Sequence, residues 1–239
     1  MERYRILEKE ILRNKQWTFD EKVSEIFDWH IRRSVPLYDE LHHMLVDLAE
    51  PFLKSNAVVC DLGTSTGETI FNLNKRYPEM NIMFYGIDNS LPMLKKAKEK
   101  CKGIKNVKFI CSNIQDISIP KSDLIISLYT LQFIRISERN RIIDKIFKAL
   151  KNEGGFIISE KIVNQNIFLD ELFVKLYERM KKRNGFSDEE IEAKRVSLKG
   201  IMEPITYEDN YKMLKESGFS LIETFFRWHN FVGIIAIKK

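Results

Sequence analysis

From about residue 57 onward, short apolar runs alternate with charged segments of helical character, and this alternation restricts the fold more than any other feature. Apolar and polar residues do not alternate in these runs, as they would in a strand with one solvent-exposed face, so each run is expected to be buried on both faces. Strands of that kind belong to parallel sheets that helices cover on both sides. The expected strands span 57–60, 82–87, 107–110, 124–128 and 155–159.

Signals for helix ends stand between these runs. Ser90 before Pro92 predicts a helix start, and Gly103 after a lysine-rich segment predicts a helix end. Gly154-Gly155 is interpreted in the same way, as the stop after a helix over 142–150. Strands and helices that alternate with short links predict a doubly wound α/β sheet.

The end of the chain adds two β runs, over 221–226 and 231–237. The link between them is short, so they are expected to pair as an antiparallel hairpin. The whole then predicts a mostly parallel seven-stranded sheet that ends in an antiparallel hairpin. Dinucleotide-binding sheets normally end parallel, whereas class I enzymes that use S-adenosylmethionine (SAM) end in this way, which is an analogy of fold alone.

Two helical additions flank this sheet, an N-terminal extension over 1–50 and an insertion over 162–205. Each carries the pattern of a capping box, beginning at Thr18 in the first and at Ser187 in the second. No linker rich in Pro, Gly or Ser separates them from the sheet. We therefore expect residues 1–239 to form a single domain.

Composition excludes several classes of protein. The 239 residues carry a net charge of +5, which is too mild to prove a nucleic-acid partner and too positive to exclude one. Direct nucleic-acid binding is nevertheless not expected. The charged start and the absence of a long apolar run indicate a soluble, cytoplasmic protein without a membrane segment. Neither the cysteines nor the histidines have the spacing of a metal site, so no metal is expected, and the histidines are interpreted as structural or solvated.

Two further segments have structural interpretations. The lysine-rich segment 95–102 is interpreted as a solvated outer helix rather than a phosphate-binding face. An apolar stripe at helical spacing runs from Phe168 to Tyr177 and is expected in the core, with closure of the site or a subunit contact as the alternative.

The sharpest local signal is the loop Asp61–Gly67, which follows the first expected strand and precedes a helix. Its glycines, Gly63 and Gly67, would let the backbone turn sharply and approach a ligand, and the helix start would offer free N–H groups. Asp88 ends the second strand, where a carboxylate is placed to accept both hydroxyls of a ribose. The combination predicts an adenosine pocket at the carboxyl ends of the strands.

Each part of this signal also has a structural interpretation. The glycines alone could form only a tight turn, and Asp88 alone could be a solvated strand end. Asn113 follows the third strand, where such a pocket offers an acceptor to the adenine amino group, although a lone asparagine there is also a common turn former. Ile114, the next residue, is also expected to bind the cofactor.

Beyond the loop, the chain resembles the carboxy-S-adenosyl-L-methionine synthase family of the class I methyltransferase superfamily, over nearly its whole length. The most specific matching segments are Arg33-Ser34-Val35-Pro36-Leu37-Tyr38 and Thr130-Leu131-Gln132-Phe133. Other matches include 19–23, 61–67, 87–90, 159–161, 184–187, 194–195 and 230–231.

The resemblance implies an enzyme that converts SAM and prephenate to carboxy-SAM and phenylpyruvate, for use in modifying the wobble uridine of tRNA. A proton would leave the sulfonium methyl group, and the resulting ylide would capture carbon dioxide released from prephenate. SAM, carboxy-SAM or S-adenosylhomocysteine would be the bound cofactor species. The family also implies a homodimer.

The resemblance assigns ligand positions residue by residue. Arg195 would hold the added carboxylate as a bidentate donor, although an arginine on such a helix is otherwise expected to be solvated. The remaining positions would hold the SAM moiety: Tyr38, Gly63, Ser65, Asp88 and Asn89.

Three positions depart from the family pattern. Thr64 replaces a cysteine whose backbone makes the contact, and Asn113 replaces an aspartate. Leu128 replaces an asparagine that touches the ligand, and a buried ligand group left without that partner would cost about 1–3 kcal/mol. Leu128 therefore keeps open a SAM-dependent methyltransferase or a SAM-cyclising enzyme, and a third alternative is a non-catalytic SAM-binding or tRNA-associated protein.

Overall fold

A seven-stranded sheet with strand order β3-β2-β1-β4-β5-β7-β6 forms the centre of the computed structural model, which describes residues 2–12 and 16–239. β1 to β5 are parallel, while β7 pairs antiparallel with both β5 and β6. The strands are β1 Val58–Leu62, β2 Met83–Asp88, β3 Val107–Cys111, β4 Ser122–Leu128, β5 Leu150–Lys161, β6 Leu221–Trp228 and β7 Phe231–Ile237. This arrangement confirms the predicted fold class.

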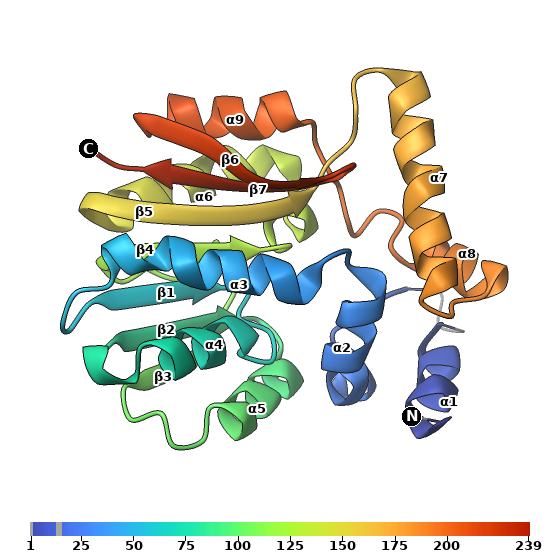
Figure 1. The fold of residues 1–239 in the computed structure, drawn as a ribbon, viewed down its shortest axis with the longest axis horizontal. Coiled ribbons are helices and arrows are strands. Elements are labelled where there is room, and N and C mark those ends of the chain that lie inside the picture. The colour runs from blue at the N-terminus through green and yellow to red at the C-terminus, as the bar shows by residue number, and fades with distance from the viewer. Residues whose placement is uncertain (1, 13–15) are drawn as a thin grey trace.

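Helices cover both faces of the sheet, which explains why the strands read as continuous apolar runs. α3 (Tyr38–Ala49) and α4 (Glu68–Arg76) pack on one face together with the short helix Glu50–Phe52. α6 (Ile136–Ala149) and α9 (Tyr207–Glu216) pack on the other face. α5 (Leu91–Lys100) lies beside α4, near β2 and β3 (Figure 1).

The helical additions gather at the end of the sheet where β1, β2 and β4 terminate, on the right of Figure 1. They comprise α1 (Glu2–Leu12) and α2 (Glu21–Ser34) from the N-terminal extension, and α7 (Ile167–Arg183) and α8 (Asp188–Ser197) from the insertion. A separate apolar cluster that includes Ile11, Trp17 and Ile26 joins α1, α2 and α8. The additions thus form a cap over the carboxyl ends of the strands.

The predicted capping box at Ser187 is confirmed, because its hydroxyl accepts from the Glu190 backbone N–H while the Glu190 side chain accepts from the Ser187 N–H. The box predicted at Thr18 is wrong. Asp20 caps α2 instead, accepting from the Val23 N–H at 3.0 Å, and Thr18 donates its hydroxyl to that carboxylate. A carboxylate in this position also complements the positive end of the helix dipole.

The glycines after α6 do not stop a helix. α6 ends at Ala149, and β5 already begins at Leu150 and runs through both glycines. A Cβ on Gly155 would lie 2.6 Å from Cζ of Phe52, so glycine is required here for the close approach of a ring to the strand. The helix ends before it reaches the glycines, so the prediction that they stop the helix is wrong.

The apolar stripe of α7 does not lie in the core, so that prediction is also wrong. Phe168 is 72% exposed, and Ile167 next to it is 76% exposed. Tyr177, at the other end of the stripe, is turned toward α2 and donates its hydroxyl to the Ser34 carbonyl at 2.9 Å. The stripe is therefore divided between an exposed face and the capped end of the sheet.

Candidate functional site

A cavity of about 700 Å³ lies between the carboxyl ends of the strands and the helical cap. All the residues predicted as site residues, from Tyr38 to Arg195, line it, including Thr64, Asn89 and Ile114. Leu128 also forms part of its wall. The structure thus brings together residues that lie more than 150 positions apart in the sequence.

The glycine loop is fixed by its own backbone. The N–H groups of Gly63 and Thr64 both donate to the Ile87 carbonyl, at 2.7 and 3.0 Å. Gly63 has a φ of 73°, and a Cβ added to it would lie 2.2 Å from Oγ1 of Thr130. Ser65 also lies in the left-handed region, with a φ of 51°. Only glycine at position 63 permits this loop to turn against β2 and the segment after β4.

Asp88 holds the loop from the other side. Its carboxylate accepts from the backbone N–H of Ser65 at 2.9 Å and from that of Ser90 at 2.8 Å. Burial nevertheless raises the pKa of Asp88 above its usual value. Each carboxylate oxygen can accept a further hydrogen bond, so Asp88 can fix the loop and still receive ligand hydroxyls.

Asn89, predicted at the ribose side, and Asn113, predicted at the adenine side, form a chain of amide contacts. Asn89 donates its amide to the Asn113 side-chain oxygen at 3.1 Å, and Asn113 donates its own amide to Asp116 at 2.9 Å. A carboxylate, that of Asp116, is therefore in direct contact with the Asn113 side chain. Sequence reasoning missed Asp116, although its spacing of three residues from Asn113 is typical of a side-chain contact within a turn.

Tyr38 lies against His42, one of the histidines expected to be structural or solvated. The rings of Tyr38 and His42 are 4.5 Å apart, and the Arg32 guanidinium lies 5.7 Å from the Tyr38 ring centre. His42 is 2% exposed, and burial lowers its pKa, so it is neutral at pH 7. His42 is therefore buried and uncharged, and its ring packs against Tyr38 at the cavity wall.

Asp61 lines the cavity, although the sequence reasoning did not single it out within the loop. It is 2% exposed, and it accepts the Thr64 hydroxyl at 2.7 Å. Burial raises its pKa to about 7, and the nearby Asp88 carboxylate adds to the shift. A buried carboxyl group that lines a cavity and has a pKa close to 7 is well placed to receive a cationic ligand group.

This pKa gives a prediction for stability. Because the folded pKa of Asp61 lies above its unfolded value, folding favours the protonated carboxyl, and that stabilisation is lost as pH rises from about 4 to about 7. We expect wild type to lose stability relative to Asp61→Asn by up to about 1.4 kcal/mol per pH unit in this window. Urea unfolding of both proteins across the pH range measures this difference. A difference that does not change with pH would contradict the assignment.

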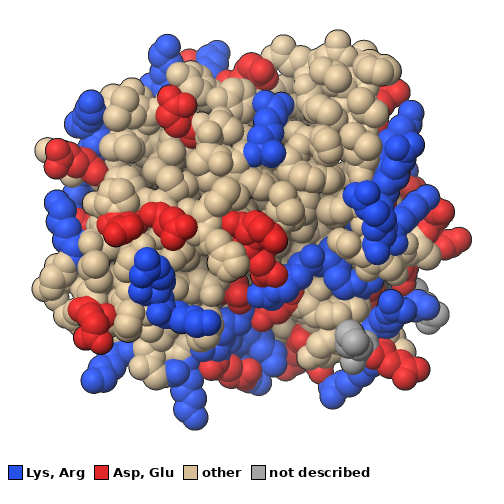
Figure 2. Space-filling view, viewed as in Figure 1, with Lys and Arg blue, Asp and Glu red and all other residues tan. Residues whose placement is uncertain are grey.

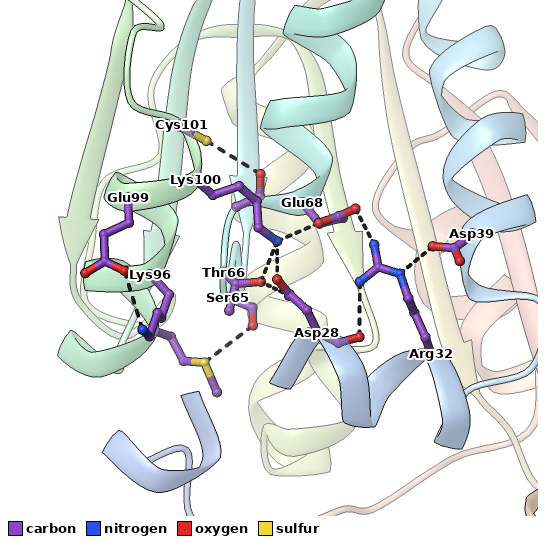
Figure 3. Close-up of polar contacts among 12 residues, drawn as sticks. Asp28, Arg32, Asp39, Ser65, Thr66, Glu68, Lys96, Glu99, Lys100 and Cys101 are labelled. Atoms are coloured by element: carbon purple, nitrogen blue, oxygen red, sulfur yellow. Dashed lines mark hydrogen bonds and ion pairs between the residues drawn. The ribbon is translucent and has the colours of Figure 1, made fainter. Parts of the chain in front are cut away.

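A network of charges ties α2 to the glycine loop (Figure 3). Lys100 lies 2.7 Å from Asp28 and 2.5 Å from Glu68, while Arg32 contacts a Glu68 oxygen at 2.6 Å. The Thr66 hydroxyl donates to Asp28 at 2.5 Å. The rest of the lysine-rich segment is largely exposed, as expected, but Lys100 is not part of that solvated face. The network links the cap to the loop.

Arg195 lies at the mouth of the cavity. Its side chain is 67% exposed, and its Nε and Nη2 donate to the two carboxylate oxygens of Glu192 at 2.7 and 2.6 Å. Arg195 thus forms a bidentate contact with a carboxylate of its own helix, and its role toward a ligand carboxylate stays a prediction. A ligand carboxylate would have to displace Glu192.

Lysines reach the same cavity from three elements. Lys161 ends β5, Lys181 belongs to α7, and Lys194 belongs to α8. Lys181 is only 8% exposed, and burial lowers its pKa to about 8. Sequence reasoning named two of them only as parts of matching segments and gave none of them a role, because nothing local distinguishes them from surface lysines.

Comparisons with known proteins fit this geometry. A family described as "Methyltransferase domain" matches residues 53–218. The carboxy-S-adenosyl-L-methionine synthase of Nautilia profundicola is 40% identical over 94% of this chain and 95% of its own length. The enzyme of the same name from Nitratiruptor sp. is 38% identical over 100% of this chain and 99% of its own.

This chain belongs to the carboxy-S-adenosyl-L-methionine synthase family. A relative with the same name in Staphylococcus epidermidis is 36% identical over 93% of this chain and 97% of its own length. Membership makes the protein a SAM-utilising enzyme and confirms the resemblance inferred from the motifs.

Solved structures support the fold of this family member. A SAM-dependent methyltransferase from Aquifex aeolicus has a TM-score of 0.60 at 20% identity, covering 93% of this chain and 100% of its own. A putative O-methyltransferase from Nostoc punctiforme has a TM-score of 0.64 at 18% identity, covering 91% and 59%. At such identities the likeness shows the fold alone.

Two kinds of feature are absent from the described part of the chain. No helix within 2–12 and 16–239 is both long and apolar enough to cross a membrane. Across the same ranges, no group of at least three His, Cys, Asp or Glu side chains is arranged to hold a metal ion.

Proposed function

We propose that this protein converts SAM and prephenate to carboxy-SAM and phenylpyruvate in the cytoplasm, for the modification of wobble uridine in tRNA. The observation that carries the proposal is the identity of 40% over 94% of the chain to a carboxy-S-adenosyl-L-methionine synthase. The cavity supports it, since one wall is an adenosine-type loop and another carries cationic side chains.

The wall residues have distinct parts in this proposal. The loop from Gly63 to Ser65 and the ribose-side pair Asp88 and Asn89 would hold the adenosine, with Asn113 at the adenine side and Ile114 next to it in the cofactor-binding wall. Tyr38 would pack against the rest of the SAM molecule. Arg195 would leave Glu192 and bind the carboxylate of the product.

The proposed chemistry balances without an outside reagent. Prephenate loses its ring carboxylate as carbon dioxide and its ring hydroxyl as hydroxide when the ring becomes aromatic. The hydroxide takes a proton from the sulfonium methyl group and becomes water. The ylide carbon then forms a bond to carbon dioxide. A cavity that excludes water would keep carbon dioxide and ylide together.

A test of the reaction is to incubate the purified protein with SAM and prephenate and to weigh the products by mass spectrometry. We expect carboxy-SAM and phenylpyruvate in equal amounts, with no S-adenosylhomocysteine. Product in the absence of prephenate, or S-adenosylhomocysteine that forms only with another acceptor, would contradict the proposal.

A SAM-dependent methyltransferase or SAM-cyclising enzyme is the second candidate, and Leu128 is the observation that favours it. Its apolar side chain lines the cavity where the family carries an amide. Such an enzyme would give S-adenosylhomocysteine or methylthioadenosine in the same assay.

A homodimer is proposed as the assembly, and the exposed apolar side chains of Ile167 and Phe168 on α7 support it. Direct binding of nucleic acid is not proposed. Figure 2 shows basic and acidic side chains mixed across the visible face, without a continuous basic surface there.

A further inference from the structure

The ammonium groups of Lys161, Lys181 and Lys194 point to a second anion-binding place within the cavity. They come from β5, α7 and α8, and all of them line the cavity. Neighbouring cations have carboxylate partners: Lys182 pairs with Asp188, and Arg195 pairs with Glu192. Within the described residues no such partner lies within 4.0 Å of the three cavity lysines.

Aromatic rings support these lysines in place of carboxylates. The ammonium groups of Lys161 and Lys181 lie 5.0 and 4.4 Å from the centre of the Tyr177 ring. Lys194 lies over the Trp17 ring. Such cation–π contacts offset about 0.5–2 kcal/mol, less than the cost of removing an unpaired charge from water.

The charges also repel one another. Burial lowers the pKa of Lys181 and that of Lys194, and neighbouring ammonium groups lower them further, Lys161 that of Lys181 and Lys181 that of Lys194. Glu178 and Glu8 act in the opposite direction on Lys181 and Lys194. Unpaired, mutually repelling cations in a cavity become favourable when an anion binds between them.

The rest of the wall indicates what kind of anion fits. Phe19, Phe133 and Phe186 also line the cavity. His30 beside them is 3% exposed, and burial lowers its pKa to about 4, so it adds no charge at pH 7. Aromatic walls around cationic groups suit a ring-bearing carboxylate better than a phosphate or an extended acid.

We infer that Lys161, Lys181 and Lys194 bind the carboxylate that the second substrate keeps in its product, and that Arg195 acts separately at the mouth. This inference rests on the proposed function. A carboxylate that leaves as carbon dioxide loses its charge in the reaction, so an ion pair to it would slow the step by stabilising the ground state. The lysines are therefore assigned to the retained side-chain carboxylate, away from the ring carboxylate.

Phenylpyruvate is the probe that separates these assignments, because it carries the retained carboxylate and lacks the departing one. We expect wild type to bind phenylpyruvate, and Lys181→Met and Lys161→Met to bind it about tenfold more weakly or worse. The control is Lys182→Met, at the next position of α7, whose ammonium pairs with Asp188 outside the cavity. Calorimetric titration measures each affinity.

Thermal unfolding separates a binding defect from a folding defect. Removing a buried, unpaired ammonium group is expected to leave the Tm of Lys181→Met equal to or above that of wild type. Equal phenylpyruvate affinity in wild type and both cavity variants, or no binding to wild type, would overturn the inference.

The reaction assay distinguishes failure of this inference from failure of the proposed function. If wild type binds phenylpyruvate, the lysine variants do not, and no carboxy-SAM forms from prephenate, then the anion site stands and the proposed reaction fails. If carboxy-SAM forms and Lys181→Met has an unchanged KM for prephenate, then the reaction stands and the anion site fails.

Discussion

Gly63→Ala is expected to abolish measurable SAM binding. The residue has a φ of 73°, which costs a non-glycine residue about 1–2 kcal/mol. The added Cβ would lie 2.2 Å from Oγ1 and 2.5 Å from Cγ2 of Thr130, so one of the two segments must move. Either movement is expected to break the paired hydrogen bonds from the loop to the Ile87 carbonyl, and with them the wall of the proposed adenosine pocket.

The chain offers a matched control at Gly103. Its φ is also positive, at 99°, but a Cβ there would meet nothing within 4 Å. Gly103→Ala is expected to lose stability through backbone strain alone and to keep SAM affinity within about twofold. Calorimetric titration with SAM and thermal unfolding of both variants measure the two effects. SAM affinity in Gly63→Ala as high as in Gly103→Ala would contradict the role assigned to the loop.

Features that depend on near neighbours in the sequence were predictable. Strands buried on both faces need apolar residues throughout, and a tight turn with a positive φ needs glycine, so the sheet and the loop at Gly63 follow from local sequence patterns. The terminal hairpin followed from its short link. Tyr38 and Arg195 came from the family resemblance, since their spacing gives no local sign that they share a cavity.

Features that depend on distant segments were not predictable from local patterns. Lys181 resembles any lysine of a polar helix until α7 is placed against β5 and the cap. Lys100 lies in a lysine-rich segment, and only the approach of α2 gives it Asp28 as a partner. Gly155 resembles a helix stop until the Phe52 ring is seen against it.

Arg195→Ala is expected to lower carboxy-SAM formation by about 10–100-fold while SAM affinity changes less than about threefold. A charge-assisted contact to a carboxylate contributes about 1.5–3 kcal/mol, reduced by at most about 1 kcal/mol for the exposed Glu192 pair that it replaces. SAM has no carboxylate on its methyl group for Arg195 to hold. Arg195→Lys is expected to restore little, because a single ammonium group cannot form the bidentate contact. Product assays together with SAM titrations measure both quantities. Equal loss of SAM and carboxy-SAM binding would mean that Arg195 holds the common part of the two molecules.

Glu192 provides a second test of this role, because both of its carboxylate oxygens already accept hydrogen bonds from the Arg195 guanidinium group. A product carboxylate must compete with it, so Glu192→Gln is expected to strengthen carboxy-SAM binding a few-fold and to leave SAM binding unchanged. The pair is largely exposed, and exposed ion pairs contribute at most about 1 kcal/mol, which sets the size of the gain. A carboxylate-binding role predicts weaker carboxy-SAM binding in Arg195→Ala, stronger carboxy-SAM binding in Glu192→Gln, and no change in SAM binding in either variant. A merely structural role of Arg195 would not give this pattern.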